Sequence, residues 1–280
     1  MIRFDKQVAV VTGSGRGLGE AYARLLAERG ARVVVHDAGV TLEGQGFDAS
    51  VADGVVNKII AAGGNAIACY ENLETREGCR RVIECALERF GRLDILVNNA
   101  GWVDRTPLEE MTPELLTRIL DIQVAAPLWL AQAALPTMKQ QHYGRVVLTS
   151  SGLGLWTEGA RPELSGYAIG KAAQIGLMNA LAANGAGADI CVNIISPVAA
   201  TRIFTGSVAP GALRPEQVAP GVAFLASSSC TVSGIILRAS NGQFSTMRWQ
   251  VGPEVDFGVE AATPEMIAEQ WGLLSQFPRS

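Results

Sequence analysis

Val-Ala-Val-Val-Thr-Gly-Ser-Gly-Arg-Gly-Leu-Gly, residues 8–19, is the segment that decides the fold. Residues 8–11 are wholly apolar, as expected of a parallel strand that is buried on both faces. The glycines come next, and a helix is predicted over about 18–29, ended by Gly30. A second strand is predicted over 32–36, with Asp37 at its end. Strand, glycine turn, helix and strand make one βαβ unit.

The same alternation continues along the chain. Helices are predicted over about 51–62, 75–90 and 113–140, and over the segment that carries Tyr167 and Lys171. Further strands are predicted over 65–70, 93–98, 145–149 and 190–195. Pro127 and Pro136 predict a kink or break within the longest helix. The fold class is therefore α/β, with a doubly wound, mostly parallel sheet covered on both faces.

Length and composition limit the class of protein. The chain has 280 residues, of which 48% are hydrophobic and 18% charged, with a formal net charge of −4. These values are typical of a globular protein, and without a basic block no nucleic-acid partner is expected. We expect one domain over 1–240 and a C-terminal extension over 241–280 that packs on it. Residues 1–6 do not resemble a signal peptide, and no run approaches the ~18 apolar residues of a membrane span, so no membrane partner is expected.

Cysteine usage indicates a cytoplasmic location. The five cysteines, at 69, 79, 85, 191 and 230, include no Cys-x-x-Cys pair, so we expect reduced thiols and no metal site. His36 and His142 have no ligand-type neighbours in the sequence, and we interpret both as structural or solvated.

The glycine turn predicts a dinucleotide site. Gly13, Gly17 and Gly19 fit the pattern Thr-Gly-x-x-x-Gly-x-Gly, which allows the backbone to approach a pyrophosphate at a helix N-terminus. Asp37 follows at nearly the ~20-residue spacing expected of a carboxylate that binds a ribose hydroxyl pair. A carboxylate there repels a 2′-phosphate, which favours NAD over NADP, whereas Arg16 in the turn argues for NADP.

A second cluster predicts proton transfer. Tyr167 and Lys171 are four residues apart, so a helix places them on one face, one turn apart. A phenol titrates near pH ~10, and a cation within ~4–6 Å lowers that pKa. Tyr167 is therefore a candidate general acid or base. The strand over 145–149 ends in Ser150 and Ser151, at the sheet edge where open α/β folds place their chemistry.

Two segments without periodicity lie near these residues. Residues 152–166 are glycine-rich, and residues 197–215 contain three prolines and suit a mobile lid. Their apolar side chains predict a bulky hydrophobic substrate: Leu153, Leu155, Trp156, Leu164, Ile203, Phe204 and Leu213. Trp102 and Trp156 are interpreted either as pocket lining or as ordinary packing.

Taken in order, residues 12–19, Asn98-Asn99-Ala100-Gly101, Ser151, Tyr167 and Lys171 resemble the short-chain dehydrogenase/reductase family over about 4–240. The resemblance implies a Rossmann-type domain of about seven strands and a homotetramer or homodimer. It also implies that Tyr167 exchanges a proton with the substrate, that Lys171 lowers its pKa and binds the nicotinamide ribose, and that Ser151 bonds the reacting oxygen.

The resemblance also implies which residues bind NAD. The predicted NAD-binding residues, which include the glycines and Asp37 named above, are Gly13, Arg16, Gly17, Leu18, Gly19, Asp37, Asn72, Leu73, Asn99, Ala100, Gly101, Tyr167, Lys171, Pro197 and Thr201.

Some positions depart from the family pattern. Gln123 stands where the family has an asparagine of the proton relay, and it either serves as a catalytic residue of that relay or is a polar residue facing buried water. Asn72 replaces an aspartate near the adenine, and Val198 replaces a glycine after Pro197. The segment between Ser151 and Tyr167 is longer than the family norm, which predicts an enlarged substrate loop.

Details resemble the (3R)-hydroxyacyl-CoA dehydrogenase module of peroxisomal multifunctional enzyme type 2. They are the long loop over 35–46, Met247-Arg248-Trp249, and a last helix opened by Thr263-Pro264-Glu265. We therefore expect an NAD-dependent oxidoreductase for a bulky secondary alcohol such as a 3-hydroxyacyl-CoA. A hydroxysteroid dehydrogenase and a catalytically silent NAD-binding regulator are the alternatives. Arg161, Arg202 and Arg214 either meet CoA phosphates or are ordinary surface charges.

Overall fold

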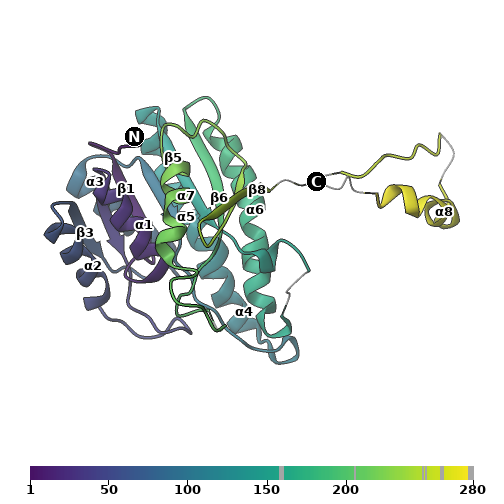
Figure 1. Ribbon diagram of the computed structural model, residues 1–280, viewed down its shortest axis with the longest axis horizontal. Helices are drawn as coiled ribbons and strands as arrows, with labels where there is room; N and C mark the ends of the chain where they lie inside the picture. Colours follow the sequence, from purple (N-terminus) through teal and green to yellow (C-terminus); the bar gives the residue numbers. More distant parts are fainter. Residues whose placement is uncertain (158–160, 205, 248, 250, 259–261, 277–280) are drawn as a thin grey trace. The chain divides into compact units, whose positions relative to one another are not determined.

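The computed structural model describes residues 1–157, 161–204, 206–247, 249, 251–258 and 262–276 (Figure 1). The chain divides into two compact units, Met1–Thr246 and Met247–Ser280. How the 241–280 extension packs on the domain stays a prediction.

One sheet of eight strands forms the centre of the first unit, in the order β3-β2-β1-β4-β5-β6-β7-β8. The strands are β1 (Val8–Thr12), β2 (Arg32–His36), β3 (Asn65–Cys69), β4 (Ile95–Asn98), β5 (Gly144–Thr149), β6 (Ile190–Val198), β7 (Ile236–Ser240) and β8 (Gln243–Met247). All pairings from β3 to β7 are parallel. The strand order reverses between β1 and β4, and the carboxyl ends of these two strands flank the crevice where such sheets bind ligands.

The α/β, mostly parallel Rossmann-type fold is confirmed, and the sheet has eight strands where about seven were expected. The addition is β8, which follows β7 across Asn241 and Gly242, both with positive φ (50° and 76°). Asn-Gly is the dipeptide that two-residue hairpin turns prefer, because both positions of the turn need φ above zero. Neither β7 nor β8 was located from periodicity.

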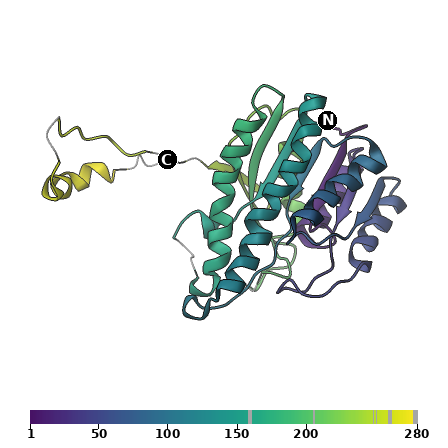
Figure 2. The same ribbon diagram turned by 180° about the vertical axis from the view of Figure 1, so that it is seen from behind.

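Helices cover both faces of the sheet. Figure 1 shows α1, α2 and α7 on one face, and Figure 2 shows α4, α5 and α6 on the other. The helices are α1 (Gly17–Glu28), α2 (Ser50–Ala61), α3 (Arg76–Phe90), α4 (Pro113–Leu120), α5 (Ala126–Gln141), α6 (Ser165–Gly185) and α7 (Ala219–Leu225). Alternate strand residues such as Val33 and Val35 join the core under α1 and α2. Helix α7 was not predicted from the sequence.

The long helix predicted over 113–140 consists of three pieces. A π-helical turn, Asp121–Ala125, separates α4 from α5. Pro127 explains the break, because it lacks the N–H that would bond to the carbonyl of Gln123 four residues earlier. The side-chain amide of Gln174 on α6 donates to that carbonyl instead. Pro136 lies inside α5 without ending it.

The same segment bears on the expectation that no run of the chain is long and apolar enough to span a membrane. By length and composition Pro113–Gln141 is long and apolar enough to cross a membrane, although no such run was expected. Within the first unit, Ile119, Leu130 and Ala134 of this segment are buried. It therefore contributes to the core that covers one face of the sheet.

The second unit contains the predicted last helix, α8 (Pro264–Leu274). Thr263 precedes it, and its hydroxyl accepts a hydrogen bond from the N–H of Met266 (3.2 Å), which is an N-cap. Arg248, one of the residues that carried the resemblance, lies outside the described residues.

Candidate active site

The turn after β1 is fastened to the turn after β4. The Thr12 hydroxyl accepts hydrogen bonds from the N–H groups of Asn99 (3.0 Å) and Ala100 (3.1 Å) and donates to the Val97 carbonyl (3.3 Å). The Asn99 amide donates to the carbonyls of Thr12 and Gly13, each at 3.0 Å. Two strand ends far apart in the sequence are thereby held as one wall at the switch point. Thr12 was not among the predicted site residues.

Only glycine fits at two positions of this turn. Gly13 has a φ of +61°, and a Cβ there would lie 2.8 Å from the Cα of Ala100. A Cβ on Gly19 would collide with the carbonyl oxygen of Gly13. The cradle therefore keeps the N-terminus of α1 free of side chains, as an anionic group bound there requires.

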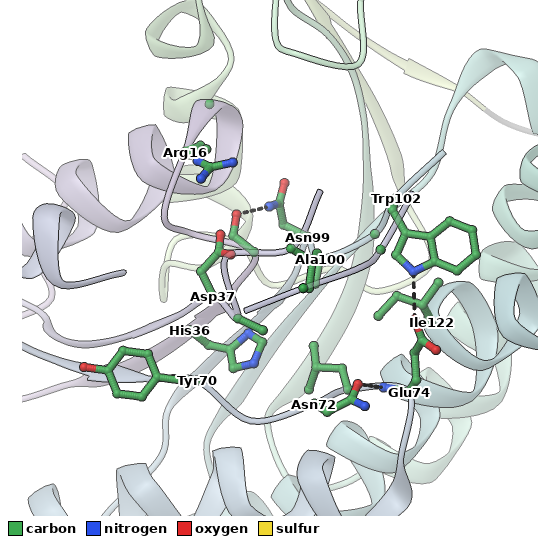
Figure 3. Close-up of a pocket in the computed structure, with 18 of the residues that line it drawn as sticks. Arg16, His36, Asp37, Tyr70, Asn72, Glu74, Asn99, Ala100, Trp102 and Ile122 are labelled. Carbon is green, nitrogen blue, oxygen red and sulfur yellow. Dashed lines mark hydrogen bonds between the residues drawn. The ribbon is translucent and has the colours of Figure 1, made fainter. Parts of the chain in front are cut away.

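A cavity of about 570 Å³ extends from this cradle along the ends of β1, β2 and β3. Figure 3 shows Arg16, Asp37, Asn72, Asn99 and Ala100 around it. Its lining includes these predicted cofactor residues: Gly13, Arg16, Gly17, Leu18, Asp37, Asn72, Leu73, Asn99, Ala100, Gly101 and Thr201. Gly19 is instead buried under the turn.

Asp37 lies at the end of β2 with its carboxylate held by the backbone. Its two oxygens accept the N–H groups of Gly15 (2.9 Å) and Gly39 (2.8 Å). Arg202, from the segment after β6, also lines this cavity and donates to the Val40 carbonyl (2.8 Å). Burial, assisted by the charge of Arg16, lowers the pKa of Arg202. Arg202 is thus placed at the dinucleotide cavity.

A second group of contacts was missed by sequence reasoning. The Glu74 carboxylate pairs with Arg118 (2.8 Å) and accepts from the indole N–H of Trp102 (3.1 Å; Figure 3). The Arg118 guanidinium lies 4.9 Å from the Trp102 ring and also donates to the Gly44 carbonyl (3.0 Å). The Glu74 N–H donates to Asn72 Oδ1 (2.9 Å). These residues come from four separate segments, so no local pattern could have joined them.

A second cavity, of about 410 Å³, adjoins the first and is lined by all four candidate catalytic residues. They are Ser151, Tyr167, Lys171 and Gln123. The two cavities share lining residues: Leu18, Asn99, Gly101, Thr201 and Ile203. A molecule bound in the first cavity can therefore reach the catalytic residues in the second.

Ser151, Tyr167 and Lys171 form a compact group. The Ser151 side chain lies close enough to the Tyr167 hydroxyl to lower its pKa. Lys171 Nζ donates to the Thr149 carbonyl (2.9 Å) and lies 5.5 Å from the centroid of the Tyr167 ring. The Ser150 hydroxyl donates to the Lys171 carbonyl (2.7 Å), which fixes the first turns of α6 against the end of β5.

Burial dominates the acid–base behaviour of this group. It raises the pKa of Tyr167, and the Ser151 side chain only partly opposes it. Burial also lowers the pKa of Lys171 to about 8. Desolvation disfavours the charged form of both residues. The prediction that Lys171 lowers the pKa of Tyr167 below its ordinary value is therefore wrong for the chain by itself.

Gln123 lies in the π-helical turn and is 1% exposed. Its side-chain amide donates to the Trp102 carbonyl (3.1 Å), while Oε1 has no hydrogen-bond partner among the described residues. Its relay role and its contact with buried water both stay predictions.

The loops place most of the expected apolar side chains at the second cavity. Leu153, Trp156, Leu164, Ile203 and Phe204 line it, together with Pro197 and Arg161. Leu155 is packed in the core, and Leu213 is not among the described lining residues. Arg214 is likewise absent from the described lining of either cavity. Residues 158–160 and Thr205, in the expected loop and lid, lie outside the described part of the chain.

The family model for short chain dehydrogenases matches residues 7–208. The chain belongs to the short-chain dehydrogenase family. This dehydrogenase is 36% identical to peroxisomal multifunctional enzyme type 2 of Drosophila melanogaster over 288 residues, which cover 100% of this chain and 47% of that protein. It spans less than half the length of the first curated relatives that it matches.

Solved structures of dehydrogenases have the same fold as this chain. A short chain dehydrogenase from Mycobacterium avium superposes with a TM-score of 0.84 at 31% identity, over 98% of this chain and 97% of that one. A 7α-hydroxysteroid dehydrogenase solved with NADH and 7-oxo glycochenodeoxycholic acid gives a TM-score of 0.75 at 29% identity, over 86% and 95% of the two chains. This dehydrogenase is therefore an oxidoreductase of a family whose named members act on CH–OH groups.

Proposed function

We propose that this dehydrogenase uses NAD to interconvert a bulky hydrophobic secondary alcohol and its ketone, with a 3-hydroxyacyl-CoA thioester as the substrate class. The observation that carries the proposal is the junction of the two cavities, where Ser151, Tyr167 and Lys171 face a mostly apolar space next to a glycine cradle.

The first cavity suits NAD by its shape and donors. Its residues would hold the pyrophosphate at the turn after β1, the adenosine ribose at Asp37, and the base against Leu73, Ala100 and Ile122. Thr201, Pro197 and Lys171 line the way to the second cavity and would meet the nicotinamide end. The related hydroxysteroid dehydrogenase structure, solved with NADH, supports this choice. When bound, NAD accepts or supplies the hydride.

The chain's own residues supply the proton and orient the substrate. During ketone reduction the Tyr167 hydroxyl donates its proton to the substrate oxygen, and during alcohol oxidation the phenolate takes it back. The Ser151 hydroxyl, next to Tyr167, donates a hydrogen bond to the same oxygen. Lys171, with a pKa of about 8, carries its charge in most molecules at pH 7. This charge would attract the phenolate as it forms during the reaction, although it does not outweigh burial in the chain by itself.

The choice of cofactor yields a prediction for Asp37→Ala. We expect wild type to prefer NAD over NADP. In the variant the ratio of kcat/KM for NAD to kcat/KM for NADP should fall at least about tenfold, because hydrogen bonds to charged groups contribute ~1.5–3 kcal/mol. Loss of the contacts with Gly15 and Gly39 weakens the binding of NAD and NADP alike. The measurement is therefore the ratio of the two kcat/KM values.

Asp48→Ala is the matched control for Asp37→Ala, because that carboxylate lies on the same loop and bonds to Ser50. Its ratio should equal the wild-type ratio. A wild type that prefers NADP, or an Asp37→Ala ratio equal to the wild-type one, would contradict the proposal and make Arg16 the better guide.

The apolar lining of the second cavity supports a bulky substrate. Each buried methylene contributes ~0.8 kcal/mol, so several extra carbons outweigh one hydrogen bond. The relationship to multifunctional enzymes of peroxisomes favours the thioester, and Arg161 at the cavity gives a cation of the kind that a CoA phosphate requires. The hydroxysteroid dehydrogenase neighbour makes a hydroxysteroid the second candidate.

A substrate panel tests this choice. We expect kcat/KM with NAD to be highest for a 3-hydroxyacyl-CoA, lower for a hydroxysteroid and lowest for a short polyol. A faster polyol would contradict the apolar-pocket argument, and a faster steroid would contradict the thioester alone. NADH binding with no turnover on any of the three would favour the silent regulator.

A cytoplasmic location and a homodimer or homotetramer remain proposals from the sequence. The hydratase and epimerase activities in the names of longer relatives belong to those proteins.

A further inference from the structure

Two cysteine thiols are in direct contact beside the dinucleotide cavity. Cys69 is the last residue of β3 and is buried, and Cys85 lies on α3 and is partly exposed. Their sulfur atoms are 3.2 Å apart. We propose that Cys69 and Cys85 are a site of reversible disulfide formation, and that the oxidised form binds the dinucleotide more weakly.

The geometry is close to that of a disulfide. A disulfide holds its sulfurs about 2 Å apart, so the two would need to approach by roughly one ångström. Strand β3 is the edge strand of the sheet, with a neighbouring strand on one side only. Its end can therefore move with less disturbance than a central strand could. Cys85 is the more exposed of the two and is the one that a reagent reaches first.

A low-molecular-weight disulfide such as oxidised glutathione supplies the oxidising equivalents. The Cys85 thiolate attacks one of its sulfurs, the reagent's S–S bond breaks, and one glutathione leaves as the thiolate. Cys69 then loses its proton and attacks the Cys85 sulfur, which releases the second glutathione. In total the protein gives up two electrons and two protons and the reagent becomes two thiols. The Cys69 thiol donates a hydrogen bond to Cys85 and lowers the pKa of Cys85, which favours the first attack.

The end of β3 is connected to the proposed cofactor site by backbone hydrogen bonds. The Cys69 carbonyl accepts the N–H of Asp37 (3.0 Å), and Cys69 pairs with His36 in the sheet. The next residues, 70–74, line the first cavity, and Figure 3 labels Tyr70 and Asn72 among them. Drawing Cys69 toward α3 therefore displaces Asp37 and this wall together. The effect on the dinucleotide rests on the proposed function, whereas the disulfide itself does not.

The experiment treats the full chain with oxidised glutathione and reads two quantities. Intact and peptide mass spectrometry should show the loss of two hydrogens and a Cys69–Cys85 crosslink. NADH fluorescence should show a Kd raised at least about tenfold, the ~1.4 kcal/mol that weakening one hydrogen bond to the Asp37 carboxylate would cost. Dithiothreitol should restore both values.

Variants separate this site from the other thiols. Cys85→Ser and Cys69→Ser should each form no crosslink and keep the reduced protein's Kd after treatment. Cys79→Ser is the matched control. Cys79 lies on α3, as Cys85 does, but its thiol donates a hydrogen bond to the Leu73 carbonyl. It should crosslink as wild type does.

Three results would overturn the inference: a glutathione adduct on Cys85 without the crosslink, a crosslink between other cysteines, or a Cys69–Cys85 crosslink with an unchanged Kd. If the reduced protein fails to bind NADH, the proposed function is wrong, and the mass measurement still decides whether the disulfide forms.

Discussion

Tyr167→Phe is expected to reduce turnover ~10²–10⁴-fold, the range that general acid–base catalysis contributes, while the Kd for NADH stays within about twofold of wild type. The phenolic hydroxyl lies near Ser151 in the second cavity, and the ring that remains keeps its packing beside Lys171. The chemistry is therefore removed with little change in shape.

Tyr22→Phe provides the matched control. Tyr22 is a fully buried tyrosine of α1 outside the described lining of both cavities, and its hydroxyl has no partner among the described residues. Its removal should leave turnover unchanged and should not lower stability, because no hydrogen bond is lost. Retention of more than about a tenth of the rate in Tyr167→Phe would remove Tyr167 from the role of acid and base.

The pH dependence should differ between the two directions. Oxidation of the alcohol needs the phenolate, and burial raises the pKa of Tyr167, so kcat/KM for oxidation should increase with pH. Reduction of the ketone needs the phenol and should fall over the same range. Parallel pH profiles in the two directions would contradict the assignment.

Much of the site was predictable because its residues occupy fixed places in a repeated βαβ pattern. The glycines follow the apolar strand over 8–11, and Asp37 follows the next strand. Parallel strands bring their carboxyl ends to one edge of the sheet, so these residues meet there. Tyr167 and Lys171 were predictable from their helical spacing together with the strand upstream, which ends in two serines at the same edge of the sheet. The break in the long helix was predicted from Pro127 and Pro136, and the structure places it before Pro127 only, where the proline removes the partner of the carbonyl four residues earlier.

Other features depend on contacts that a one-dimensional pattern does not contain. Glu74 meets Arg118 and Trp102 only after three separate segments have folded. Thr12 was interpreted only as the first residue of the glycine motif, yet it ends β1 and its hydroxyl joins two turns. The pKa of Tyr167 was predicted in the wrong direction, because charge spacing was visible in the sequence and the depth of burial was not.

Lys171→Met should inactivate the enzyme and yet stabilise the fold at neutral pH. Burial lowers the pKa of Lys171 to about 8 in the folded chain, against ~10.4 for an unfolded lysine. Below pH ~8 the folded state must hold a charge that the unfolded state solvates more easily, and the shift corresponds to ~3 kcal/mol of lost stability. Methionine fills a similar volume without a charge, but it leaves the Thr149 carbonyl without its donor, which costs ~1–3 kcal/mol.

We therefore expect the variant to unfold with a free energy up to ~2 kcal/mol higher than wild type at pH 7. The lowered pKa of Lys171 in the folded chain also determines how stability changes with pH. Between pH ~8 and ~10.4 the unfolded chain binds more protons than the folded chain, so wild type gains stability as the pH rises and the advantage of the variant disappears. Urea unfolding at pH 7 and at pH 10, without added dinucleotide, measures both values. Turnover at pH 7 should fall at least ~10²-fold, because the charge beside Tyr167 is gone.

Lys139→Met is the control, since Lys139 is an exposed lysine of α5 whose replacement should change stability by less than ~0.5 kcal/mol at either pH. A Lys171→Met protein that is less stable than wild type at both pH values would show that the hydrogen bond with Thr149 outweighs desolvation. A stability difference independent of pH would show that Lys171 does not titrate in this range. The expected result instead identifies Lys171 as a residue retained for catalysis at a cost in stability, which is the pattern of a functional site.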